Sequence, residues 1–287
     1  MKKVFFYIIL ASLLLLCGCS GEQPQIAATT RPVYDFTAYL CQGTGLSVGR
    51  LVTENVSCLH DYTLQVRQMR TIEAADLIVI SGAGLESFLD DALSGHSNII
   101  DSSQGIELLC GEHDHHDEEH HHEQDPHIWL SVENARIMSQ NICNALITQY
   151  PQHQALFTAN MQSLNNEFDA LESYGKEALS NLSCRELITF HDGFSYFCNY
   201  FDLQLLHALE EESGSEASAE ELKELILLVQ EHHLPAIFTE ENGSVSAASV
   251  IAAQANIESY ALNMGMADKG YFETMYHNID TIKEALG

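Results

Sequence analysis

Histidine and carboxylate side chains fill one stretch of the chain, residues 111–125, which reads GEHDHHDEEHHHEQD. Six histidines and seven Asp or Glu residues stand there without an apolar residue, so this His-rich tract cannot pack into a hydrophobic core. Imidazole and carboxylate groups bind zinc and related divalent ions. The tract therefore predicts metal contacts, although a solvated loop, a tag-like addition or a metal buffer without a defined site has the same composition. The predicted metal contacts in the tract are His113, His115, His116, His120, His121 and His122.

Three other histidines lie at the ends of predicted elements. His191 directly follows a predicted strand, His127 precedes a helix start at Ser131, and His60 precedes a polar helical stretch. Ligand sites in α/β folds form beyond the carboxyl ends of strands, and three imidazoles with one oxygen donor form a tetrahedral zinc site. Each histidine taken alone is more often a hydrogen-bonded structural residue.

One glutamate and two aspartates complete this set of candidates. Glu240 follows the predicted strand 235–239 and is a candidate fourth ligand, or the cap of the next helix. A ligating imidazole needs an acceptor for its other ring N–H. Asp61 and Asp192, each next to a candidate histidine, are candidates for that role or for turn capping.

Predicted strands and helices alternate along the chain, which favours an α/β fold. Short apolar runs predict strands at 76–82, 187–190 and 235–239, and helices are expected at 85–93, from Ser131, from about 151 to 180, and after Ser218. Ser218 and Glu221 form a predicted capping box. Apolar residues at helical spacing predict a last helix with Phe272, Met275, Ile279, Ile282 and Leu286 on one face.

We expect two lobes, each with a small and mostly parallel sheet, joined by one long rigid helix. The expected divisions are a signal peptide at 1–18, a tether at 19–30, an N-terminal lobe at 31–150, a connecting helix at 151–181 and a C-terminal lobe at 182–287.

The first 18 residues predict a processing signal. Lys2 and Lys3 precede an apolar run too short for a typical membrane span, and Leu16-Cys17-Gly18-Cys19 resembles a bacterial lipobox. This pattern predicts lipidation of Cys19 and anchoring at the outer face of the cell membrane. A plain secretory peptide or a membrane anchor is the alternative.

Composition excludes some partners. The formal net charge is −29, or −31 without the two N-terminal lysines, so the chain repels nucleic acid and attracts cations.

The six cysteines that follow the predicted lipobox lack the CxxC spacing of thiolate zinc sites, and we expect them to be core residues or to form one or two disulfides. We predict a monomer that contacts the membrane only through its lipid. The six cysteines are Cys41, Cys58, Cys110, Cys143, Cys184 and Cys198.

Four sequence motifs together resemble the metal-binding solute receptors of zinc and manganese ABC importers, the cluster A-I or TroA-like family. They are Ala74-Ala75-Asp76 with Ser81 to Glu86, Asp125-Pro126-His127-Ile128-Trp129-Leu130, Phe190-His191-Asp192-Gly193-Phe194-Ser195-Tyr196-Phe197, and Ile237-Phe238-Thr239-Glu240 together with the closing Tyr271, Asn278 and Leu286. The resemblance covers about residues 45–287.

The resemblance implies a receptor that binds zinc outside the cytoplasm and delivers it to an ABC permease without catalysis. By position His60, His127 and His191 would be ligands, and the tract would match the loop of zinc-type members. Manganese-type members often carry a carboxylate at the place of His191, so manganese is the alternative metal. Three imidazoles favour zinc.

The chain departs from the family pattern in two places. Leu262-Asn263-Met264 stands where many members have LDP, whose aspartate is often the fourth ligand, and Leu59 precedes His60 where a proline is usual. Water, Glu240 or a group from the tract would then be the fourth ligand. A zinc-dependent hydrolase, a surface zinc buffer and an adhesin are the alternative functions.

Overall fold

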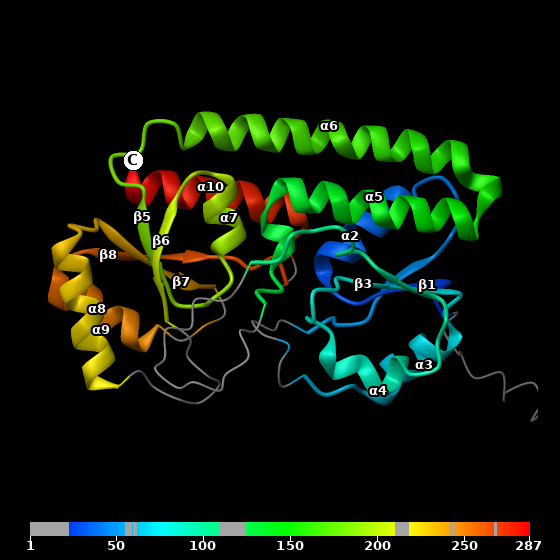
Figure 1. Ribbon diagram of the computed structural model, residues 1–287, viewed down its shortest axis with the longest axis horizontal. Coiled ribbons are helices and arrows are strands. Elements are labelled where there is room, and N and C mark those ends of the chain that lie inside the picture. The colour runs from blue at the N-terminus through cyan, green and yellow to red at the C-terminus, as the bar shows by residue number, and fades with distance from the viewer. Residues whose placement is uncertain are drawn as a thin grey trace, which may run out of the picture.

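A computed structural model of the chain describes residues 23–54, 59, 62–109, 124–209, 218–241, 243, 245–266 and 269–287. The predicted signal peptide, Cys19, His60, Asp61 and the six histidines of the tract lie outside these residues. Two lobes lie side by side beneath a pair of long helices (Figure 1).

The N-terminal sheet is fully parallel, with strand order β2-β1-β3-β4. Its strands are β1 (Ile26–Ala28), β2 (Val48–Arg50), β3 (Leu77–Ile80) and β4 (Ile99–Asp101). All three residues of β1 are buried between its two neighbours. The tether predicted for residues 19–30 is therefore wrong at its C-terminal end, where β1 lies. The sequence alone did not indicate this strand, because a run of three residues is too short to be recognised without the strands that pair with it.

Helices on both faces cover this sheet, as expected for parallel strands buried on both sides. They are α2 (Arg31–Leu40), α3 (Val66–Ala74) and α4 (Asp90–Leu93), with a short 3-10 turn η1 (Ser87–Leu89). The single helix predicted at 85–93 is wrong. The backbone after β3 has positive φ at Gly82, Ala83 and Gly84, and this left-handed turn delays the start of helical structure.

The C-terminal sheet repeats the parallel arrangement in the order β6-β5-β7-β8. Its strands are β5 (Glu186–Thr189), β6 (Gln204–Ala208), β7 (Ala236–Glu240) and β8 (Glu258–Leu262). Three helices belong to this lobe: α7 (Ser195–Tyr200), α8 (Ala219–Glu231) and α9 (Ser246–Ala255). The predicted capping box of α8 is confirmed, because Ser218 and Glu221 each bond the other's backbone N–H.

Long helices join the two lobes. The 25-residue α6 (Gln154–Ala178) runs over both sheets, beside α5 (Val132–Gln149) and the last helix α10 (Tyr271–Leu286) (Figure 1). The turns η2 (Ile128–Leu130) and η3 (Pro151–His153) precede α5 and α6. The predicted cap of α5 is confirmed, since Ser131 Oγ accepts the N–H of Asn134 at 3.3 Å. The expected fold, two parallel α/β lobes joined by a long helix, is confirmed.

Cysteines in the described residues are free thiols, and Cys41, Cys143 and Cys198 are core residues. The fourth, Cys184, is half-buried. Across the described ranges, no helix combines the length and apolar character that crossing a membrane requires.

Candidate metal site

Two of the predicted ligands meet where the lobes face each other. His127 lies just before η2 of the N-terminal lobe, and His191 follows β5 of the C-terminal lobe. Their Nε2 atoms are 3.3 Å apart, and their ring planes are 82° apart. Both side chains are largely buried, with exposed fractions of 8 % and 16 %.

Carboxylates face the opposite nitrogen of each ring. Asp125 Oδ1 lies 2.8 Å from His127 Nδ1 and also accepts the backbone N–H of His127. Glu240 Oε2 lies 3.5 Å from His191 Nδ1. An ionised carboxylate only accepts hydrogen bonds, so a proton on His127 Nδ1 leaves the Nε2 lone pair directed at His191. This is the second-shell pattern of metal-binding histidines.

The separation of the two Nε2 atoms is that of a hydrogen bond between the rings, and it also suits two nitrogens on one ion. Two nitrogen ligands of tetrahedral zinc, each at about 2.0–2.1 Å, are about 3.3–3.4 Å apart. No three His, Cys, Asp or Glu side chains within the described ranges form a complete group for a metal ion. Two histidines alone do not complete a metal site, and the third predicted ligand, His60, lies outside the described residues.

Glu240 is the last residue of β7, not the residue after the strand. Its side chain is buried, and this burial raises its pKa to about 7, while positive charge on His127 lowers it. Its observed neighbour is Nδ1 of His191 and not the Nε2 edge where the two rings converge. This position suits an acceptor that orients His191. Its predicted role as fourth ligand stays a prediction.

Both polar atoms of the Asn263 side chain form hydrogen bonds. Its Oδ1 accepts the N–H of Gly265 at 2.7 Å, and its Nδ2 donates to a carboxylate oxygen of Glu241. Lys269 donates to the other oxygen of Glu241. The position that departs from the family pattern is therefore filled by a closed network inside the C-terminal lobe.

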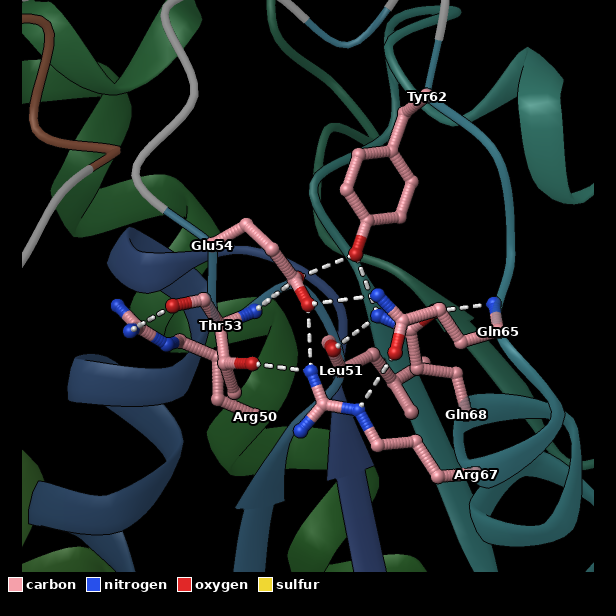
Figure 2. Close-up of polar contacts among 8 residues, drawn as sticks. All are labelled: Arg50, Leu51, Thr53, Glu54, Tyr62, Gln65, Arg67 and Gln68. Atoms are coloured by element: carbon pink, nitrogen blue, oxygen red, sulfur yellow. Dashed lines mark hydrogen bonds and ion pairs between the residues drawn. The ribbon is translucent and has the colours of Figure 1, made fainter.

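A polar network links the residues on either side of the segment 55–61, which contains His60. Glu54, at one end of this segment, accepts hydrogen bonds from Tyr62, Gln65 and Arg67 at the other end (Figure 2). The hydrogen bond from Tyr62 is the main cause that lowers the pKa of Glu54, to about 2. Between the two ends, Leu59 is buried in the main core. The network therefore ties Glu54, which follows β2, to Tyr62 and to the start of α3.

The base of the two-histidine site joins the lobes. The indole N–H of Trp129, which is fully buried, donates to Met264 O at 2.8 Å.

Gly193 lies against the ring of His127. A Cβ at Gly193 would lie 2.3 Å from Met264 Cε and 2.9 Å from His127 Nδ1. Only a residue without a side chain fits at that position.

The comparisons with known proteins agree with this architecture. The sequence profile of ZnuA, "Zinc-uptake complex component A periplasmic", matches residues 26–285. The chain belongs to the ZnuA family. Members of this family are metal-binding components of ABC transporters, which act with a membrane permease, and they are not enzymes.

Relatives within the ZnuA family differ in the metal that their names give. The high-affinity zinc uptake system protein ZnuA of Bacillus subtilis is 27% identical over 98% of this chain and 96% of its own length. The manganese ABC transporter substrate-binding lipoprotein PsaA of Streptococcus anginosus is 24% identical over 100% and 99%. A crystal structure of ZnuA superposes with a TM-score of 0.80 at 26% identity, over 92% of this chain and 100% of that one. The family thus establishes a divalent metal ion as cargo and leaves zinc and manganese as alternatives.

Sequence reasoning missed the ring partners in this ZnuA-family site. It placed the acceptors next to the histidines in sequence, whereas Asp125 precedes His127 by two residues and Glu240 lies on another strand. Asp125 was available as part of the DPH motif. The contact between Glu240 and His191 depends on the pairing of β5 with β7, which no local pattern contains.

Proposed function

We propose that this protein is an extracytoplasmic zinc receptor that delivers Zn²⁺ to an ABC permease. The observation that supports zinc most directly is the 3.3 Å between Nε2 of His127 and Nε2 of His191. Imidazole nitrogen suits zinc, whereas manganese favours oxygen ligands. A carboxylate at position 191 would shift that preference toward manganese.

The proposed coordination uses His60, His127 and His191, with a fourth donor from water, Glu240 or the His-rich tract. Asp125 would hold the ring of His127, and Glu240 would orient His191 unless it ligates. The tract would gather zinc through many weak contacts, and Cys19 would carry the lipid that keeps the receptor at the membrane.

A competitive titration of the purified, chelator-stripped protein with zinc against manganese tests this proposal. Fluorescence of Trp129, the only tryptophan, reports binding because its ring lies 5.4 Å from that of His127. We expect one tight zinc that survives deletion of residues 111–124 and disappears in His127→Ala and His191→Ala.

Two other results would contradict the proposal. If deleting the tract removes all binding while both alanine variants bind normally, the protein is a surface zinc buffer. If manganese competes with zinc on equal terms, the protein is a manganese-type receptor of the same family.

A further inference from the structure

Leu109, which precedes the His-rich tract, and Asp125, its last residue, are joined to each other and to the opposite lobe. Asp125 N–H donates to Leu109 O at 3.0 Å, which closes the base of the tract. Tyr196, on α7 of the C-terminal lobe, contacts both ends: its hydroxyl accepts the N–H of Leu109 at 2.9 Å and donates to Asp125 O at 3.0 Å. One hydroxyl group therefore bridges Leu109, just before the tract, and Asp125 at its end.

The same aspartate contacts the candidate ligand. Asp125 Oδ1 accepts both the backbone N–H and the Nδ1–H of His127, and Asp125 is 4 % exposed. Tyr196 has the same exposed fraction, 4 %. Buried hydrogen bonds of this kind fix geometry strongly, because a lost partner leaves a polar group without water.

We propose that the hydroxyl of Tyr196 is a positioning group that ties the base of the His-rich tract to the C-terminal lobe and, through Asp125, sets the orientation of His127. The inference rests on the proposed function, since the consequence of a misplaced His127 is weaker binding of zinc in the cleft. Tyr196 donates to the backbone O of Asp125, and the side chain of Asp125 in turn bonds the ring of His127.

The test replaces the hydroxyl and keeps the ring. Tyr196→Phe removes both hydrogen bonds, and Tyr200→Phe is the matched control because Tyr200 lies on the same helix and its hydroxyl bonds Glu172, away from the tract. In the metal-free protein we expect faster amide exchange at Leu109 and Asp125, and shifted His127 ring signals in NMR, in Tyr196→Phe only. Unchanged exchange and unchanged ring signals would overturn the proposal without any metal present.

Zinc binding gives the second readout. We expect Tyr196→Phe to lower the affinity for zinc by about tenfold, which corresponds to about one net hydrogen bond. The affinity of Tyr200→Phe should stay within about twofold of the parent protein. If Tyr196 only stabilised the fold, Tyr196→Phe would lower the zinc affinity by the same factor whether or not Asp125 is also replaced. If Tyr196 acts through Asp125, its effect shrinks when Asp125→Asn is already present, and full additivity of the two substitutions would overturn the proposal.

His127→Ala separates this inference from the proposed function. If His127→Ala abolishes zinc binding while Tyr196→Phe binds normally, the receptor function stands and the role of Tyr196 is wrong. If His127→Ala binds zinc like the parent protein, the proposed function is wrong, and the His127 ring signals in the metal-free Tyr196→Phe protein alone decide whether the hydroxyl orients the ring.

Discussion

The geometry of the candidate site depends on which nitrogen each imidazole presents. In both His127 and His191 a carboxylate lies at Nδ1, so the Nε2 atoms converge. At 3.3 Å one Nε2–H can donate to the other Nε2, and two unprotonated Nε2 atoms can share a cation. The tautomers of the two imidazoles therefore decide whether the rings bond each other or face a metal ion.

Gly193 allows this convergence, and its replacement gives the first prediction. An added Cβ would press on His127 Nδ1, the atom that faces Asp125. We expect Gly193→Ala to lower zinc affinity and to cost about 1–3 kcal/mol of stability through overpacking. Competitive titration and urea unfolding measure the two effects separately.

Gly175→Ala is the matched control for this prediction. Its Cβ would lie 2.4 Å from Phe201 Cε1 in the core between helices, so it should cost similar stability and leave zinc affinity unchanged. Equal zinc affinities in both variants would show that the space at Gly193 does not position His127.

Glu86 provides a prediction about pH. Its carboxylate is buried and accepts hydrogen bonds from Thr29, Ser81 and Gly82. Burial is the largest influence and raises its pKa from 4.5 to about 7, against the lowering effect of those hydrogen bonds. A raised folded-state pKa means that the native state binds the proton more tightly than the unfolded chain. The stability contributed by this proton is full below pH 4.5 and is lost as the pH rises through about 7.

Comparison with Glu86→Gln isolates this effect from the other titrating groups. Urea unfolding of metal-free protein at pH 5 and pH 8 should show a larger loss of stability in the parent than in the variant. The pH-dependent loss of unfolding free energy should be larger in the parent than in the variant by about 3 kcal/mol. If both lose stability in parallel between these two pH values, Glu86 does not titrate on folding.

At the scale of elements, the sequence predicted those parts whose signals are local. Ser131 and Ser218 marked the starts of α5 and α8 because an N-cap acts within one turn of helix. It did not predict β1, whose three residues form a strand only between β2 and β3. The meeting of His127 with His191 was predicted from the family motifs and not from spacing, because 64 residues separate them.

The connection between β2 and α3 carries the third prediction. Glu54 joins the two ends of the segment that includes His60 (Figure 2). If His60 is a ligand, Glu54→Gln should weaken zinc by about tenfold, the lower end of the range for lost outer partners of a metal site. The measurement is a competitive zinc titration.

Glu73→Gln is the control for this substitution, because Glu73 lies on α3 with 70 % of its side chain exposed. It removes the same charge without breaking the network. Wild-type zinc affinity in Glu54→Gln would mean that this network stabilises α3 but does not position a ligand.

At the scale of the whole molecule, the lobes are fixed to each other at more than one point. Trp129 and Tyr196 bridge them near the two histidines, and Asp35 of α2 accepts the first N–H of α10 at Tyr271. Aromatic rings of Phe36, Phe168 and Tyr271 pack edge to face across α2, α6 and α10. Such packing favours a fixed relation of the lobes, so entry and release of metal would depend on local groups and on charge.

The net charge of −29 leads to the last prediction, which concerns the rate of zinc capture. A negative field concentrates cations near the cleft and raises the association rate. Raising the salt from roughly 0.01 M to roughly 1 M shortens the Debye length from about 30 Å to about 3 Å. Stopped-flow fluorescence of Trp129 should then show association slowed by about tenfold or more, with dissociation changed much less because salt screens contacts at bonding distance far less than long-range attraction. Six carboxylates between residues 111 and 124 carry part of this field, so deletion of residues 111–124 should reduce the salt dependence of association. A salt effect confined to dissociation would show that capture depends on the coordinating side chains and not on the field of the molecule.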